Sequence, residues 1–389
     1  MRWRFALAAL LVILAGHVSG TPQRAERMTI LRAGALIDVL QGRTIPDATV
    51  VVEGERITYA GPRVDAPEKM PPGADEISLP RLTLTPGFID AHVHLTLGGT
   101  AADNARATLE AGFTTVLDLG AVDGAVVRLR QEIDAGRVMG PRVLAAGRWI
   151  GVSGGTCDFS GIGVRGAMAF RDRVDEEVRR GADIIKVCVS GWLSQARTDP
   201  QKYEISDEEL NAVITQAHAR GRRVAVHAIS TAGIGKAIEM GADLVVHGGF
   251  VDAPTVRRMK ERKIYLLPTL FSFTRSQPEP DVTALSAHLR ESVAAGLPVA
   301  FGTDAGVIRH GNNGREFSAL LELGLSPIEV LRAATSHAAA AVGLETSIGV
   351  LAPGRSADIV GLDGDPLRDP SALQRVVFVM HRGRVIKRP

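Results

Sequence analysis

The segment GADIIKVCVSG, residues 181–191, places a lysine inside an apolar run. Most residues of the run are β-branched and glycine bounds it at both ends, which is typical of a strand buried on both faces in a parallel sheet covered by helices. An unpaired ammonium is costly in such a setting. Lys186 therefore requires a carboxylate partner, a lowered pKa or a chemical modification.

Seven further segments share this apolar character, and helix-like segments separate them. The eight predicted strands cover 87–95, 114–120, 142–147, 183–191, 223–229, 243–249, 264–270 and 298–306. Clear helix patterns cover 207–221, 231–241, 255–263 and 326–344, and we expect only one helix in 271–297. Eight alternating strand and helix units predict an α/β fold with a (β/α)8 TIM barrel over residues 86–344. An open, doubly wound sheet is the alternative.

The two ends of the chain differ from this middle part. Residues 28–85 and 345–389 contain short β-type runs that Gly, Pro and Asp separate. They predict a small β-sandwich domain formed by both termini.

Residues 1–20 match a secretory signal peptide. Arg2 and Arg4 precede an apolar stretch from Phe5 to Ala15, and small residues follow up to Gly20. We expect export to the periplasm or the outside of the cell. An uncleaved anchor helix is the alternative, although the apolar stretch is short for a membrane span. No cysteine follows it, so a lipoprotein anchor is not indicated.

Composition narrows the range of partners. Of the 389 residues, 45% are apolar and 23% charged, and the formal net charge is only +2, with Lys and Arg scattered along the chain. These values predict a globular protein and give no indication of nucleic-acid binding. The only cysteines are Cys157 and Cys188, for which we expect free thiols, with a bridge as the alternative. Residues 161–166 match GxGxxG but follow no strand directly, so dinucleotide binding is rejected.

Polar residues occur where several predicted barrel strands end, the place where barrel enzymes carry their chemistry. His92 and His94 are two residues apart on a strand and therefore share a face. Imidazole and carboxylate are preferred ligands of zinc and similar ions. One histidine at a strand end is usually a core residue, but several at one rim predict a metal centre, and their number indicates two ions. The candidate residues are His92, His94, Lys186, His227, His247 and Asp304.

These motifs resemble the amidohydrolase superfamily. The matching stretches are PGFIDAHVHL (86–95), IKVCVSG (185–191), RVAVHAIS (223–230), DLVVHGG (243–249) and AFGTDAG (300–306), with LAPGRSADIVGLDGDPL (351–367) near the end. Within the superfamily the chain is most similar to the dipeptidases, prolidase-like and Xaa-Arg-type, and to the imidazolonepropionase-like hydrolases.

The resemblance implies a role for each candidate. Lys186 would be carbamylated by CO₂ and would bridge two divalent metal ions, expected to be zinc; its pairing with Asp183 or another acid is the alternative. His92, His94 and Asp304 would hold one ion, and His227 and His247 the other. A hydroxide would bridge the ions and attack the carbonyl, and Asp304 would pass the water's proton to the leaving amine.

Two departures from relatives concern substrate binding. Where relatives often carry a histidine after strand three, this chain has GGTCDF (154–159), and segment 271–297 looks shortened. Candidate substrate contacts in loops at the strand ends are Tyr203, Arg148, Arg197, His310 and Arg315.

The leading hypothesis is a metal-dependent amidohydrolase that cleaves an amide or peptide bond in a small-molecule substrate, a dipeptide or an N-acyl amino acid. The alternatives are a lactonase or phosphotriesterase at the same metals, a cyclic-amide hydrolase or deaminase, and a non-catalytic binding protein. A deaminase is disfavoured because Ser230 stands three residues after His227, where deaminases typically carry glutamate. A homo-oligomer remains open.

Overall fold

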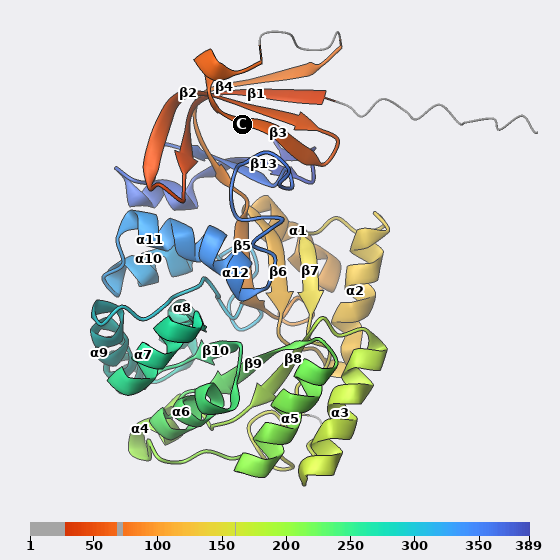
Figure 1. Cartoon of the computed structure of the whole chain (residues 1–389), viewed down its shortest axis with the longest axis vertical. Helices are drawn as coiled ribbons and strands as arrows, with labels where there is room; N and C mark the ends of the chain where they lie inside the picture. The colour runs from red at the N-terminus through yellow and green to blue at the C-terminus, as the bar shows by residue number, and fades with distance from the viewer. Residues whose placement is uncertain (1–27, 68–72, 160) are drawn as a thin grey trace, which may run out of the picture.

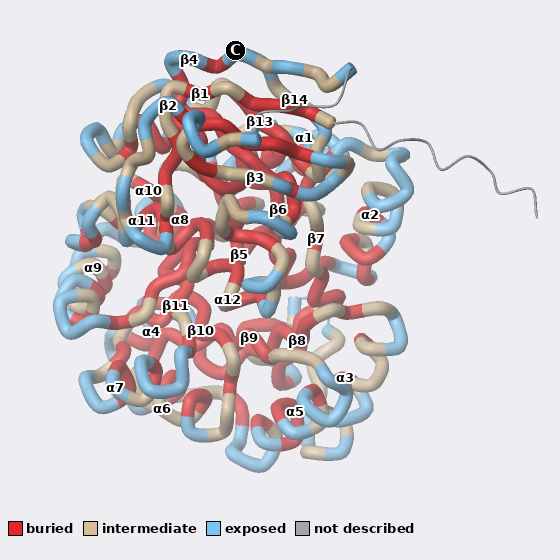
Figure 2. Tube along the Cα trace, turned by 45° about the horizontal axis from the view of Figure 1, so that its top comes forward, coloured by how far each residue is buried: buried red, intermediate tan, exposed pale blue. Residues whose placement is uncertain are grey.

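The computed structural model describes residues 28–67, 73–159 and 161–389. The predicted signal peptide, residues 1–20, lies outside the described residues. The chain has a mixed α/β fold, in which a sheet made from both chain ends lies beside an inner set of parallel strands with helices around them (Figure 1). Figure 2 shows that the inner strands are mostly buried and that the outer helices have exposed positions along their length.

The sheet at the chain ends has seven strands in the order β14-β13-β12-β4-β1-β2-β3. Strand β4 joins the two ends of the chain, because it pairs in parallel with β1 and antiparallel with β12. Apolar residues such as Leu31, Val50 and Phe378 are fully buried in a hydrophobic core that belongs to this seven-stranded sheet. Its members are β1 (Met28–Asp38), β2 (Arg43–Glu53), β3 (Arg56–Pro62), β4 (Asp75–Pro86), β12 (Ile359–Asp363), β13 (Val376–His381) and β14 (Arg384–Lys387).

The parallel strands form two sheets, β5-β6-β7 and β8-β9-β10-β11. In β5, β6, β8 and β10 every residue is buried, as the continuous apolar runs predict. The bounds are β5 (Phe88–Val93), β6 (Phe113–Asp118), β7 (Arg142–Ala145), β8 (Ile184–Cys188), β9 (Arg223–Ala228), β10 (Leu244–His247) and β11 (Tyr265–Leu267).

The predicted eighth strand, 298–306, pairs only through single bridges. Ala300 N donates to Leu266 O of β11 at 2.9 Å, and Asp304 N donates to His92 O of β5 at 2.8 Å. Asp304 has φ of 59°, so the backbone leaves the extended conformation where a regular strand would continue. A bridge between Ile150 and Val187 likewise links the segment after β7 to β8.

Helices follow most of the parallel strands, and they begin and end near the predicted bounds. The helix expected over 207–221 is α5, which starts at a capping box made by Ser206 and Glu209. Among the helices of the described residues, none combines the length and the apolar composition that crossing a bilayer requires. The helices are α1 (Ala101–Glu110), α2 (Ala125–Asp134), α3 (Ala167–Arg180), α4 (Leu193–Thr198), α5 (Asp207–Ala219), α6 (Thr231–Met240), α7 (Ala253–Arg262), α8 (Leu270–Ser276), α9 (Glu279–Ala294), α10 (Arg315–Glu322), α11 (Pro327–Arg332) and α12 (Ala338–Ala341).

Segment 271–297 departs from its prediction. It contains two helices, α8 and α9, and not one. Gln277 between them is extended, with φ of −118° and ψ of 155°, because the following Pro278 disfavours the helical conformation at the residue before it. The helix expected over 326–344 is also divided, by a π-helical turn at Ala333–His337 between α11 and α12.

Candidate active site

Three predicted ligands lie together at the carboxyl end of β5. His92 Nε2 is 3.3 Å from His94 Nε2, and Asp304 Oδ1 is 3.5 Å from the first nitrogen and 3.3 Å from the second. Their ligand atoms all lie within 4.8 Å of one another, a spacing that one ion can span. Alternation along the strand puts both imidazoles on one face, and the bridge between β5 and segment 298–306 brings the carboxylate to them.

Two more predicted ligands extend this group. His227 lies near the end of β9 and His247 ends β10, and their ring centroids are 4.6 Å apart. The His247 ring is also 5.2 Å from the His92 ring. Burial, together with the charge of nearby Lys186, lowers the pKa of His227 to about 3. Burial likewise holds the pKa values of His92 and His247 well below the usual one, so these imidazoles are neutral and keep a lone pair for a ligand.

Hydrogen bonds fix which nitrogen faces inward. His94 Nδ1 is 2.8 Å from Gly120 O, a carbonyl that can only accept, so in the neutral ring the lone pair of His94 is on Nε2. Although burial opposes the shift, the hydrogen bond and charge of Asp304 raise the pKa of this imidazole. Thr269 donates its hydroxyl hydrogen to Pro268 O, and it therefore accepts from His247 Nδ1 at 2.7 Å. The lone pair of His247 is on Nε2 for the same reason. Outer partners of this kind orient metal-binding histidines.

Lys186 is 3% exposed in the middle of β8 and faces the same cavity. Burial lowers its pKa to about 7, against the opposing charge of Asp304. In the part of the chain that the structure describes, its ammonium has no hydrogen bond or close ion pair. The alternative pairing with Asp183 is wrong, because that carboxylate is bound to Arg130 and accepts from Ala145 N at 2.9 Å.

Two buried carboxylates hold the site's backbone in place. Asp90 accepts hydrogen bonds from Thr303 Oγ1 at 2.6 Å and Asn313 Nδ2 at 2.7 Å, tying β5 to segment 298–306. Asp118 accepts from Leu95 N at 2.7 Å. Burial raises the pKa of each carboxyl to about 6, although these hydrogen bonds oppose the shift. Sequence reasoning missed both residues, although Asp90 stands two residues before His92 and the alternation along β5 could have identified it.

Unusual backbone conformations occur at the same end of the strands. His247, Thr269 and Asp304 have φ values of 72°, 52° and 59°. A left-handed conformation costs a non-glycine residue about 1–2 kcal/mol, and such strain tends to gather at functional sites. Two of these residues are candidate ligands: His247 at the end of β10 and Asp304 in segment 298–306.

The candidate ligands form one side of a cavity of about 400 Å³. The other side is mostly apolar, and sequence reasoning missed it because its members come from different loops without a shared spacing. The apolar lining comprises Leu97, Val122, Trp149, Phe159, Trp192 and Val307, together with Cys157 and Cys188.

The two cysteines form a disulfide, which corrects the expectation of free thiols. Cys157 belongs to the loop between β7 and α3, and Cys188 is the last residue of β8. The loop bends back over the strand ends, so residues 31 positions apart in sequence meet at the cavity wall. In the departure segment GGTCDF, Thr156 N and Oγ1 both donate to Glu204 at 2.8 Å.

Three of the predicted substrate contacts are engaged elsewhere and do not line this cavity. Arg148 pairs with Glu176 at 2.7 Å and with Glu177 at 2.6 Å. The other two also meet acids that sequence reasoning did not anticipate: Arg197 binds Asp281 of α9, and Tyr203 donates to Asp207 at 2.8 Å.

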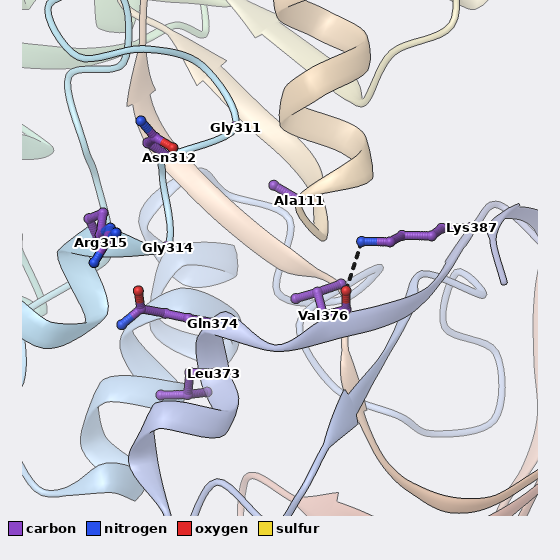
Figure 3. Close-up of a pocket in the computed structure, with 9 residues that line it drawn as sticks. All are labelled: Ala111, Gly311, Asn312, Gly314, Arg315, Leu373, Gln374, Val376 and Lys387. Carbon is purple, nitrogen blue, oxygen red and sulfur yellow. Dashed lines mark hydrogen bonds between the residues drawn. The ribbon is translucent and has the colours of Figure 1, made fainter. Parts of the chain in front are cut away.

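The remaining two predicted contacts also lie outside the cavity lining. His310 is buried, 3.1 Å from Thr108 Oγ1 and 3.2 Å from His94 O, so it supports the backbone of a candidate ligand. Arg315 begins α10 and lines a different cavity of about 350 Å³, beside β13 and β14 (Figure 3). In that cavity Lys387 Nζ donates to Val376 O at 2.8 Å.

The donor set fits a centre of divalent metal ions. Four imidazoles, at least two with a lone pair aimed inward, one carboxylate and one unpaired buried amine face a single space. Such nitrogen and oxygen donors suit zinc and related ions. The set exceeds what one four-coordinate ion needs while a position stays open for water.

Comparison with known proteins agrees with this chemistry. The Amidohydrolase family model matches residues 83–387. Ochratoxinase from Aspergillus niger is 27% identical over 427 residues, covering 93% of this chain and 87% of that protein. Imidazolonepropionase from Sphingopyxis alaskensis is 27% identical over 403 residues, covering 90% and 94%.

Solved structures give the same result. A Xaa-Pro dipeptidase with methionine bound in its active site superposes with a TM-score of 0.84 at 29% identity, covering 92% of this chain and all of the other. The family match spans most of the chain and includes every residue of the histidine cluster. The chain therefore belongs to the amidohydrolase family of hydrolases.

Proposed function

We propose that this chain is a metal-dependent hydrolase that cleaves an amide or peptide bond in a small molecule, a dipeptide or an N-acyl amino acid. One observation carries the proposal: four imidazoles, a buried lysine and a carboxylate converge on one side of a cavity at the strand ends. The similarity to enzymes named as dipeptidase, imidazolonepropionase and ochratoxinase supports hydrolysis at carbon–nitrogen bonds.

His92, His94 and Asp304 would hold one divalent ion, and His227 and His247 a second. The ions, with zinc as the expected metal, would polarise the scissile carbonyl and lower the pKa of water. Asp304 takes a proton from the attacking water and delivers it to the leaving nitrogen, so the products are a carboxylate and a free amine. The imidazoles of His92, His227 and His247, whose pKa values burial lowers, stay neutral and move no proton.

Lys186 would serve as a carbamate between the two ions. Its neutral Nζ would attack the carbon of CO₂: a nitrogen–carbon bond would form, one carbon–oxygen π bond would open and leave its electron pair on oxygen, and one proton would leave the nitrogen for solvent. The result replaces a buried cation by an anion that two cations neutralise. The support is positional: Lys186 shares the cavity with all five other candidate ligands, and among the described residues no carboxylate forms a hydrogen bond or close ion pair with it.

Three further proposals concern the molecule as a whole. The bridges of segment 298–306 to β5 and β11, and of Ile150 to β8, support a closed (β/α)8 barrel over 86–344. The shared sheet supports a β domain from 28–85 and 345–389. The Cys157–Cys188 disulfide supports export, because disulfides persist in oxidising compartments.

The test is a panel of dipeptides, N-acyl amino acids and lactones, incubated with the metal-loaded protein with and without a chelator. We expect amine release that the chelator abolishes and that added zinc restores. Amine release that persists after complete metal removal would contradict the proposal. Lactone opening without any amine release would favour an ester hydrolase at the same residues.

A further inference from the structure

The cavity is bounded by an unbroken circle of ring side chains. On the metal side, successive ring centroids lie 5.1 Å apart from His94 to His92, 5.2 Å from His92 to His247 and 4.6 Å from His247 to His227. On the outer side the chain of rings continues over Trp192, Phe159 and Trp149 and returns to His94, with separations of 5.8, 6.3, 5.1 and 5.6 Å. We call Trp149, Phe159 and Trp192 the aromatic arc.

Two of the three rings of the arc are exposed to an unusual degree, while Trp149 is buried. In the described part of the chain, eight large apolar side chains are exposed, and four of them line this cavity: Val122, Phe159, Trp192 and Val307. Phe159 is 56% exposed and Trp192 is 44% exposed. Since exposed apolar side chains are normally scattered singly, this gathering marks a binding surface.

The outer wall also lacks charge. Among the described residues that line the cavity, Lys186 and Asp304 are the only lysine, arginine, aspartate or glutamate, and both belong to the metal side. Arg148 and Arg197, the nearby cations that the sequence suggested, are bound to acids. Thr156, which lines the cavity, donates a hydrogen bond to the carboxylate of Glu204, and this negative charge would repel an anion. A carboxylate on the substrate therefore finds no counter-ion at the outer wall.

We propose that the aromatic arc binds a bulky, uncharged and apolar group of the substrate, preferably a flat ring, while the amide reaches the metal side. This inference rests on the proposed function and deepens it: the preferred substrates are amides with an aromatic or large aliphatic group on one side of the scissile bond. Ring stacking and edge contacts on tryptophan and phenylalanine supply the affinity. The disulfide positions the arc, because Cys157 lies two residues before Phe159 and is joined to the end of β8.

Two matched substrate series test the proposal. The first varies the acyl side: N-(3-phenylpropanoyl)glycine, N-succinylglycine and N-(4-aminobutanoyl)glycine. The second varies the amine side: N-acetylphenylalanine, N-acetylglutamate and N-acetyllysine. In one series we expect kcat/KM to be about 10- to 100-fold higher for the phenyl compound than for either charged one, the gain expected from burying a phenyl group. The series that shows the preference identifies which half of the substrate meets the arc.

Substitutions test whether the residues of the aromatic arc cause the preference for the phenyl compounds. Trp192→Ala should lower the ratio of phenyl to carboxylate kcat/KM about 10-fold, and Phe159→Arg should raise kcat/KM for the carboxylate compound. Met168→Ala is the matched control, because this methionine is 75% exposed but lies outside the cavity lining. A Met168→Ala effect equal to that of Trp192→Ala would overturn the assignment to the arc.

Binding supplies a measurement that does not depend on turnover. The quenching of tryptophan fluorescence reports the Kd of two matched hydroxamates on the metal-loaded protein, 3-phenylpropanohydroxamate and the monohydroxamate of succinate. We expect at least about 10-fold tighter binding of the phenyl compound. If the phenyl hydroxamate binds more tightly but no amide releases its amine, the proposal that the arc binds an apolar group is supported and the proposed hydrolysis is contradicted. Equal Kd values, a preference for the charged compounds, or a dimer that Phe159→Arg dissociates would overturn the inference.

Discussion

The buried charges at the amino and carboxyl ends of the parallel strands differ in whether the fold supplies them with hydrogen-bond partners. At the amino end of β7, Asp358 accepts hydrogen bonds from Arg142 at 2.8 Å, His381 at 2.7 Å and Arg382 N at 2.9 Å. At the carboxyl end of β8, Lys186 has no such partner in the described structure, and neighbouring imidazoles point lone pairs into a cavity. A buried charge that the fold satisfies stabilises the fold, whereas donors left facing one another are available to a ligand.

The substitution Asp304→Asn should give the largest effect at the carboxyl end. The amide keeps the shape but cannot take a proton, so we expect kcat to fall about 10³-fold or more. The melting temperature of the metal-loaded protein should change little by comparison. Asp172→Asn, an exposed carboxylate on α3, is the matched control. Near-normal kcat in Asp304→Asn would remove this residue from the reaction.

Replacing the unpaired lysine tests the same end through metal content. Lys186→Ala should lower the bound metal from two ions toward one per chain, measured by mass spectrometry, and kcat/KM about 100-fold. Added short carboxylates should restore part of the activity by taking the place of the carbamate. Lys202→Ala, at an exposed position, is the control. If Lys186→Ala retains both ions, the carbamate assignment fails.

At the amino end the expected effect is on stability alone. Asp358→Asn removes the charge that Arg142 and His381 face, and breaking such a buried pair costs about 3 kcal/mol. Urea unfolding measures the loss in free energy of unfolding, and kcat of the folded fraction should stay unchanged. A comparable loss of kcat would show that the two ends are coupled and would break the contrast between them.

The smallest effect is a dependence of this stability on pH. Burial opposes ionisation of Asp358, but the hydrogen bond and charge of His381, with Arg142, hold the pKa of that carboxyl far below its usual range. A depressed carboxyl pKa contributes stability that is present above the unfolded value of about 3.9 and disappears as pH falls through the folded value. The stability difference between the parent and Asp358→Asn should therefore shrink below about pH 4. A difference that grows with acid would contradict this account.

The sequence was most informative where chemistry repeats at strand ends. His92, His94, Lys186, His227 and His247 each lie within an apolar run, so periodicity alone placed them at one rim, and the structure brings them together. Asp304 was predicted on the same ground, from the end of segment 298–306, and the bridge between this segment and β5 brings its carboxylate to His92 and His94.

Side chains in loops were predicted poorly for a physical reason. The partners of Arg148 and Arg197 lie 29 and 84 residues away, so no local pattern reveals that these cations are already neutralised. The aromatic arc collects rings from two separate loops, and the disulfide joins residues 31 apart. Such contacts depend on how loops fold over the strands, which periodicity does not describe.

The disulfide affects which metal ions the proposed metal centre would bind. Cys157 and Cys188 line the same cavity as the four imidazoles. As reduced thiols they would offer two soft sulfur donors, which compete strongly for zinc and for copper(I). Joined to each other, the sulfurs leave the hard and borderline donors of histidine and aspartate to choose the ion. Chain produced in a reducing cytosol would thus present a different set of ligands from chain produced in an oxidising compartment, with the same amino-acid sequence.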